Sequence, residues 1–265
     1  GEKIMKVVIL AGGLGTRISE ESHLKPKPMI EIGNYPIIVH IMRIYASQGF
    51  NEFVVCAGYK QQSIKEYFAH FDMYTNDVTF DFSNGNRIIH DKPKFDWKVT
   101  IADTGERTQT AGRILRAKKY IGNETFLLTY GDAVGDIDIN AVMDSHRKSG
   151  KLGTICVYNF GQSKGVVDVS PTGNVNAFRE KSDLDGDLIN IGFMVLEPQV
   201  ISLINDDRSI LEKDVLSKLS EMNQLNAYVH RGFWQCMDTM KEKEYLEDLD
   251  KKNDCPWKIW RNRHE

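Results

Sequence analysis

The chain contains Val7-Val8-Ile9-Leu10-Ala11-Gly12-Gly13-Leu14-Gly15-Thr16-Arg17, an apolar run that leads directly into a glycine-rich loop. Residues 7–10 are mostly β-branched, as is typical of a strand buried on both faces of a sheet. Ligands of a parallel sheet lie beyond the carboxyl ends of its strands, and glycines there let backbone N–H groups approach phosphate oxygens. The stretch therefore predicts a parallel sheet with an anion-binding loop at its edge. A tight glycine-rich turn without a ligand is the alternative.

Strand-like and helix-like segments alternate through the first 160 residues. Apolar, β-rich runs predict strands at 7–10, 53–57, 126–129 and 154–158. Apolar residues at helical spacing predict helices at 38–45, 64–71, 114–121 and 142–146. This order predicts an α/β fold with a Rossmann-like, mostly parallel central sheet and helices on both of its faces.

Beyond residue 160 the predicted elements become shorter. Strands are expected at 166–169, 175–178 and 189–196. A helix is expected at about 212–222, because Ser209 followed by Glu212 has the spacing of a capping box. The charged stretch from residue 241 ends in Pro256-Trp257-Lys258-Ile259-Trp260. Two tryptophans in a polar tail predict a docking latch or a subunit contact.

The composition argues against several classes of function. Lys and Arg number 34 against 37 Asp and Glu, and no long basic block is present, which argues against nucleic-acid binding. No apolar run reaches the ~18 residues of a membrane span, and no secretory leader opens the chain, so we expect a cytoplasmic protein without a membrane partner. The cysteines lie too far apart for a CxxC pair.

The segment after the loop, Lys25-Pro26-Lys27-Pro28-Met29, carries two prolines around one lysine. Prolines restrict the backbone at their own and the preceding position, so we expect extended backbone that presents Lys27 at a fixed place. Arg17 and Lys27 beside a glycine-rich loop predict a triphosphate site. The loop is not a dinucleotide-binding GxGxxG, which would need glycine in place of Ile18, nor a Walker loop, which would need GK[ST].

Residues 10–17 together with residues 25–29 resemble the signature of the sugar-1-phosphate nucleotidyltransferases. Three further motifs are similar to the glucose-1-phosphate cytidylyltransferase branch of that family: Ser19-Glu20-Glu21, Gly131-Asp132 and Phe233-Trp234-Gln235-Cys236-Met237-Asp238-Thr239. The similarity extends over about residues 5–260. It implies that CTP and a sugar 1-phosphate give a CDP-sugar and pyrophosphate, with Mg²⁺ as cofactor. It also implies assembly into homotrimers or hexamers.

Two aspartates are candidate metal ligands. Asp132 follows the strand at 126–129, which places it at the sheet edge that carries the glycine-rich loop, and Asp238 lies in a turn before a helix near 241. Their spacing does not show that they meet. The resemblance implies that both hold Mg²⁺, which proteins bind through one or two carboxylates plus phosphate oxygens. The attacking phosphate is already anionic, so catalysis is expected to depend on alignment and charge rather than on a general base.

The resemblance assigns expected roles to further residues. The catalytic residues are Arg17, Lys27, Asp132 and Asp238. The nucleotide-binding residues are Leu10, Ala11, Gly12, Gly13, Gly15, Thr16, Arg17, Lys27, Thr108, Arg113 and Gly131. The acceptor-binding residues are Glu180, Lys181 and Asn190. Without the resemblance, Thr108 and Arg113 indicate a helix start and a solvated arginine. The choice of base is expected to depend on backbone contacts in the loop and near Gly112.

We expect a single domain in three parts. The nucleotide-binding half spans about 5–160, a β-rich acceptor-binding half spans about 161–240, and the C-terminal latch or oligomer contact spans about 241–265. This division follows the resemblance and the change, after residue 160, from alternating strands and helices to shorter predicted strands.

The acceptor side departs from the family pattern. Ser182 follows the Glu-Lys pair where a proline is usual, residues 161–166 replace an Arg-Phe-Gly turn, and Ala133 replaces a glycine. Ile191-Gly192 stands after Asn190 where two glycines are usual, which predicts a bulky side chain where backbone should approach the sugar. Another hexose phosphate, or another phosphorylated acceptor, is therefore a second hypothesis. UTP or dTTP as donor and a homologue that binds nucleotide without turnover are further alternatives.

Three other motifs are excluded by their context. Residues 161–165 fit the GxSxG hydrolase elbow, but strand-like residues follow where that motif needs a helix. Residues 103–105 fit the DTG of aspartic proteases, which need a second copy or a small all-β dimer. Residues 183–186 resemble part of a calcium loop, but Lys181 and Gly192 occupy its first and twelfth ligand positions.

Overall fold

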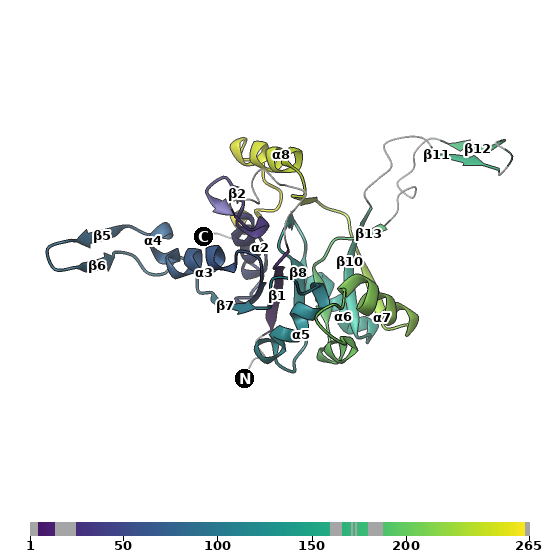
Figure 1. Ribbon diagram of the computed structural model, residues 1–265. Helices are drawn as coiled ribbons and strands as arrows, with labels where there is room; N and C mark the ends of the chain where they lie inside the picture. Colours follow the sequence, from purple (N-terminus) through teal and green to yellow (C-terminus); the bar gives the residue numbers. More distant parts are fainter. Residues whose placement is uncertain are drawn as a thin grey trace.

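The computed structural model describes residues 5–13, 25–159, 166–170, 172, 174–179 and 188–262. Within these residues the central sheet has eight strands in the order β13-β10-β14-β8-β1-β4-β7, with β15 paired to β10. Figure 1 labels β13, β10, β8, β1 and β7 of this sheet. The strands are β1 (Lys6–Ala11), β4 (Glu52–Ala57), β7 (Lys98–Asp103), β8 (Phe126–Tyr130), β10 (Gly153–Asn159), β13 (Leu188–Asn190), β14 (Met194–Leu196) and β15 (Leu225–His230). Strands β8, β1, β4 and β7 run parallel, and β14 is antiparallel to β8. The predicted mostly parallel sheet is confirmed.

The helices and four small strand pairs lie outside this sheet. The α-helices are α2 (Ile37–Ala46), α3 (Gln61–Ala69), α4 (Phe71–Thr75), α5 (Thr110–Ile121), α6 (Ile139–Ser149), α7 (Ser217–Glu221) and α8 (Met240–Lys251). The 3-10 turns are η2 (Lys27–Met29), η3 (Pro198–Leu203) and η5 (Ile259–Asn262), and η4 (Leu211–Leu216) is a π-helical turn. The strand pairs outside the main sheet are β2 (Glu31–Ile32) with β3 (Tyr35–Pro36), β5 (Val78–Asp81) with β6 (Asn86–Ile89), β9 (Ala133–Gly135) with β16 (Trp234–Cys236), and β11 (Val166–Val169) with β12 (Val175–Arg179).

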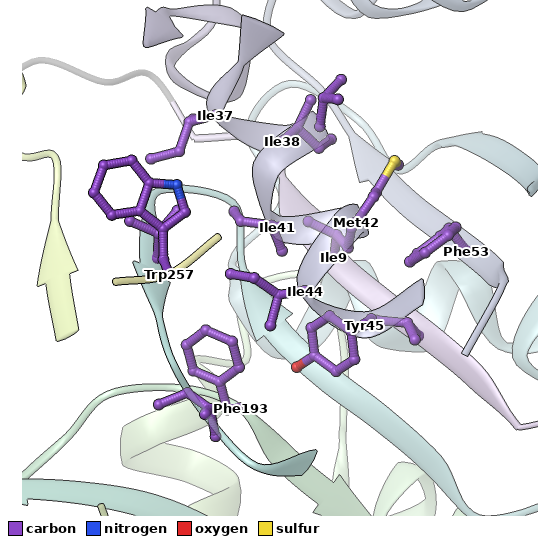
Figure 2. Packing of buried hydrophobic residues seen from close by; sticks show 14 of the residues in the cluster. Ile9, Ile37, Ile38, Ile41, Met42, Ile44, Tyr45, Phe53, Phe193 and Trp257 are labelled. Carbon is purple, nitrogen blue, oxygen red and sulfur yellow. The ribbon is translucent and has the colours of Figure 1, made fainter. Parts of the chain in front are cut away.

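Strand β1 is buried on both faces, as its β-branched sequence predicts. Val7 and Ile9 belong to one hydrophobic cluster, and Val8 and Leu10 belong to a second cluster on the other face of the sheet. The first cluster includes the apolar side of α2, and Figure 2 shows Ile9 among the side chains of that helix. The second includes α5. The two layers hold β1 rigidly, so its carboxyl end is a firm support for the loop that follows.

Three sequence predictions need correction. The strand expected at 189–196 is broken into β13 and β14, because Gly192 and Phe193 have φ angles of 80° and 52°. The helix expected at 64–71 breaks near His70 into α3 and α4. The capping box expected at Ser209 is not formed: Ile210 is the N-cap residue of η4 and no side chain caps it. Ser209 Oγ instead accepts hydrogen bonds from the backbone of the preceding loop.

The C-terminal segment packs onto α2. Trp257 is fully buried, its indole N–H donates to His40 Nδ1 at 3.3 Å, and its ring stacks on Phe233 at 5.7 Å between centroids. Trp260 is also buried and lies under the Arg43 guanidinium, 4.2 Å from the ring centroid. The tryptophans of the tail therefore belong to the core of their own chain. In the described part of the chain, no helix is both long and apolar enough to cross a membrane.

Candidate active site

The β9–β16 pair brings the two candidate aspartates together. Asp132 lies between β8 and β9, and Asp238 follows β16. The two strands pair antiparallel with Ala133 opposite Cys236, and the Met237 N–H donates to the Asp132 carbonyl at 2.8 Å. Residues that are distant in the sequence therefore become immediate neighbours at one edge of the sheet.

Lys27 connects both carboxylates. Its Nζ lies 2.9 Å from Asp132 Oδ2 and also hydrogen-bonds Asp238 Oδ1. Only 11% of the lysine side chain is exposed, against 32% of Asp132 and 24% of Asp238. Burial by itself lowers the pKa of the Lys27 ammonium, but the two carboxylates outweigh it and the net shift of the pKa is upward. Lys27 is therefore a permanent cation between two carboxylates.

The backbone that carries Lys27 differs from the expected extended chain. Pro26 is extended, with ψ of 147°, but Lys27–Met29 forms the 3-10 turn η2, closed by the Met29 N–H to the Pro26 carbonyl at 2.8 Å. A proline at the first turn of a helix loses no intrahelical hydrogen bond and fixes φ, which makes the turn compatible with Pro28. The turn still restricts where the lysine can reach.

The Glu242 carboxylate holds the backbone at Asp238. Its carboxylate accepts the Asp238 N–H at 2.7 Å and the Thr239 N–H at 2.8 Å. Thr239 Oγ1 accepts the Glu242 N–H in return, so the capping box of this part of the chain lies at the start of α8. Thr239 and Glu242 have the T-x-x-E spacing that is the sequence signature of this cap.

Gly12 and Gly13, the described part of the glycine-rich loop, border a cavity of about 320 Å³. Its lining consists of Leu10, Ala11, Gly12, Gly13, Lys27, Pro28, Thr108, Gln109, Thr110, Arg113, Tyr130, Gly131 and Asp132. The carboxyl ends of β1 and β8 meet at this cavity, where the Gly131 N–H donates to the Leu10 carbonyl at 3.0 Å. Most of the described residues that were expected to bind the nucleotide or the metal therefore lie at this one cavity.

Arg113 is buried, in contrast to the solvated arginine that its neighbourhood in the sequence indicates. Its guanidinium donates to the Gly12 carbonyl at 2.9 Å, to Thr104 Oγ1 at 2.9 Å and to the Gly105 carbonyl at 2.6 Å. A Cβ at Gly12 would lie 2.2 Å from this guanidinium, so any larger residue there would displace the Arg113 side chain from its present place. Arg113 therefore ties the loop to the segment that precedes α5.

Several expected positions are either not among the described residues or do not line the cavity. Gly15, Thr16, Arg17, Glu180 and Lys181 fall outside the described residues, as do Ser182 and most of 161–166. Gly112 does not line the cavity. A Cβ at Gly112 would lie 2.6 Å from the Asp207 carbonyl, so this glycine allows α5 to pack against another segment. Thr110 and Arg113, close to Gly112 in the chain, do line the cavity, so the expectation that base choice depends on backbone contacts near Gly112 stays a prediction.

Ile191-Gly192, which stands where the family usually has two glycines, does not have the predicted structural consequence. The side chain of Ile191 is 2% exposed and belongs to the core cluster of α2, so it does not enter the site. Gly192 has a φ of 80° and packs on Tyr130, where a Cβ would be 3.0 Å from the ring. Asn190 Oδ1 accepts the Gly192 N–H at 3.1 Å. The core accommodates the side chain of Ile191. The prediction that this residue places a bulky side chain where backbone should approach the sugar is therefore wrong.

The described residues can hold a hard cation through two carboxylates. Within the described part of the chain, no group of three or more His, Cys, Asp or Glu side chains gathers as a metal cage. Asp132 and Asp238 alone fit Mg²⁺, because Mg²⁺ usually keeps several waters and completes its shell with substrate phosphates. The cavity beside them is the place where such phosphates would lie.

The chain belongs to the nucleotidyl transferase family, whose pattern it matches over residues 6–251. It is 46% identical over 257 residues, 97% of this chain, to the whole of the glucose-1-phosphate cytidylyltransferase of Salmonella typhi. It is 40% identical over 97% of its length to the whole of a probable glucose-1-phosphate cytidylyltransferase of Bacillus subtilis. A solved structure of a UTP-bound UGPase from Acinetobacter baumannii has the same fold, with a TM-score of 0.70 and 17% identity over 98% of each chain. The family resemblance seen in the sequence is confirmed.

Proposed function

We propose that this chain transfers the cytidylyl group of CTP to glucose 1-phosphate, giving CDP-glucose and pyrophosphate. The observation that carries the proposal is the contact of Lys27 with Asp132 and Asp238 at the edge of the cavity bordered by the glycine-rich loop. Support for the particular substrates comes from the likeness to the Salmonella typhi and Bacillus subtilis proteins over nearly the whole chain.

The roles of the residues follow from their charges and places. The backbone N–H groups of residues 10–13 and the ammonium of Lys27 would bind the triphosphate, with Arg17 as a further cation. Asp132 and Asp238 would hold Mg²⁺, which supplies positive charge where negative charge develops on the leaving pyrophosphate. Asn190, with Glu180 and Lys181, would bind the sugar phosphate.

Catalysis would depend on alignment. The sugar phosphate carries its own negative charge, so no residue has to remove a proton from the attacking oxygen. The loop, tied by Arg113, would hold the α-phosphate, and the acceptor phosphate would be held opposite for in-line attack. The α–β phosphoanhydride bond breaks as the new phosphoanhydride bond forms, and pyrophosphate leaves with the bonding electrons.

A matrix of substrates tests the proposal. CTP, UTP, dTTP and GTP are each combined with glucose 1-phosphate, mannose 1-phosphate and galactose 1-phosphate, and pyrophosphate release is followed with Mg²⁺. The pair of CTP with glucose 1-phosphate is expected to have the highest kcat/KM. Selective turnover of another pair would replace the proposed substrates. Nucleotide binding without pyrophosphate release from any pair would contradict an enzymatic role.

We also infer that the chain self-associates, with the β5–β6 hairpin as one contact. The hairpin projects from the body of the molecule (Figure 1), and Phe80 and Phe82 are 53% and 93% exposed, with stacked rings. Exposed aromatic side chains that lie together are a frequent mark of protein contacts. Light scattering of the purified chain is expected to give an oligomeric mass, and Phe82→Ser to lower it; a monomer at every concentration would contradict the inference.

A further inference from the structure

Glu212 joins two walls of the cavity without lining it. The Tyr130 hydroxyl donates to Glu212 Oε1, and Thr110 Oγ1 donates to Glu212 Oε2 at 3.3 Å. Tyr130 ends β8, and Thr110 begins α5; both line the cavity. The Leu211 N–H donates to Thr110 Oγ1 at 2.8 Å, which fixes η4 against the start of α5. One carboxylate therefore holds a residue from each wall.

Tyr130 extends this connection to the acceptor side. Asn190 Nδ2 donates to the Tyr130 hydroxyl at 3.4 Å, and Asn190 Oδ1 accepts the Gly192 N–H at 3.1 Å. Gly192 lies against the Tyr130 ring so closely that a Cβ there would be 3.0 Å from it. The short segment between β13 and β14 is thus packed and hydrogen-bonded to Tyr130.

The charges favour one direction for these hydrogen bonds. An ionised carboxylate can only accept, so the Tyr130 hydroxyl is the donor in its hydrogen bond with Glu212. Its oxygen keeps a lone pair free to accept from the Asn190 amide, so the three side chains form a directed chain.

We propose that Glu212 is a positioning residue that holds Tyr130, and through it Asn190, in the place where the sugar phosphate is bound opposite the nucleotide. The proposal rests on the proposed function and adds a residue to it. Among the described residues, Glu212 reaches the cavity through Tyr130 and Thr110 and does not line it, so its effect is on the placing of a substrate rather than on the reacting atoms. Glu212 lies on η4, a separate element from β8 and α5. Its carboxylate can therefore hold the end of β8 and the start of α5 at a fixed distance from each other.

Two variants and their combination test the proposal. Tyr130→Phe removes the hydroxyl and keeps the ring, while Glu212→Ala removes the carboxylate. Each is expected to raise the KM for the sugar phosphate roughly tenfold, the scale for loss of a hydrogen bond to a charged group. The dissociation constant of the nucleotide, measured by calorimetry, is expected to change by less than about threefold in Tyr130→Phe, because the loop contacts stay intact. The double variant is expected to be no worse than the poorer single variant, since both break one chain.

Controls separate positioning from folding. Glu212→Gln keeps the length and one acceptor oxygen, and is expected to recover part of the sugar-phosphate KM. Glu221→Ala, at the exposed end of α7, is the matched loss of a carboxylate and is expected to leave both constants unchanged. The proposal is overturned by an unchanged sugar-phosphate KM in both single variants, by additive losses in the double variant, or by equal losses for both substrates with a lowered melting temperature. All measurements use the pair that the substrate matrix selects, so an error about CTP or glucose 1-phosphate does not decide the result for Glu212.

Discussion

At the residue scale, Lys27 sets the charge balance of the site. Its ammonium hydrogen-bonds two carboxylates, so the three groups together carry one net negative charge. A buried charge without a partner is costly. A backbone that keeps the Lys27 ammonium close to both carboxylates therefore favours this arrangement. In the proposed function, the remaining negative charge would favour a divalent cation beside the two carboxylates.

Asp132→Asn tests the carboxylate role. The amide keeps the size of the side chain but removes one negative charge from the proposed metal site, so kcat is expected to fall on the order of 100-fold or more. The melting temperature is expected to change little. Asp144→Asn, which breaks only an exposed ion pair with Arg147, is the control and is expected to keep full activity. Near-normal turnover by Asp132→Asn would remove this residue from the metal site.

At the element scale, the β9–β16 pair and the start of α8 decide where Asp238 lies. The pair sets the register between the two segments, and the capping box ends the turn that carries Asp238. Asp136 reinforces the pair, because its carboxylate accepts the Phe233 N–H at 2.6 Å. A short two-stranded ladder alone is weakly stable, so these side-chain bonds matter for the geometry of the site.

Glu242→Ala tests this element. It removes the acceptor for the Asp238 and Thr239 N–H groups, so we expect a stability loss of about 1 kcal/mol, typical of a helix cap, together with a clear fall in kcat. Thermal unfolding and pyrophosphate release measure the two effects. Glu247→Ala, which loses only the ion pair with Lys243 along α8, serves as control. Equal activity of the two variants would show that the cap does not position Asp238.

At the scale of the whole molecule, the C-terminal segment closes the core beside α2. Burial lowers the pKa of His40 to about 4, and the neutral ring accepts from Trp257 while its Nε2 lies 2.9 Å from the Ile32 carbonyl. The N–H of Nε2 therefore donates to that carbonyl. One neutral histidine connects the tail, α2 and strand β2, so its protonation acts on the contact between the C-terminal segment and these two elements.

Stability is expected to fall with pH through this histidine. The pKa is about 4 in the folded chain against 6.5 for the free side chain, so the unfolded chain binds more protons between these values. The stability is complete above pH 6.5 and is lost as the pH falls toward 4, by roughly 2 kcal/mol at pH 5. Denaturant unfolding at pH 7.5 and pH 5 measures it. His40→Gln is expected to flatten this dependence, and an equally steep dependence in the variant would contradict the assignment to His40.

Much of the fold was predictable from local patterns. The strands 7–10, 53–57, 126–129 and 154–158 all appear, because the sheet buries them on both faces and their apolar runs are continuous. The errors arose where backbone geometry overrides side-chain pattern. The expected strand at 189–196 breaks at a positive φ, and Ser209 has the spacing of a cap but its hydroxyl serves another turn.

The candidate site was only partly predictable. Lys27, Asp132 and the glycine-rich loop stand in motifs, and their expected positions at the sheet edge follow from parallel-sheet geometry. Glu212 carries no motif for this site; its spacing to Ser209 even indicated a different role. Its meaning depends on a contact with Tyr130 that is 82 positions away. Ile191 illustrates the opposite case: it occupies a position of the family motif, but its bulky side chain faces the core and not the site.

The sequence by itself determined the alternation of strands and helices, the loop after the first strand and the family of the chain, because periodicity and motifs are local properties that each segment carries alone. Only the tertiary structure decided that Lys27 contacts carboxylates 105 and 211 positions away, that Arg113 is buried against the loop, and that the tail closes on α2. Such contacts depend on which segments pair and pack, and that choice is made by the whole chain as it buries its apolar surface.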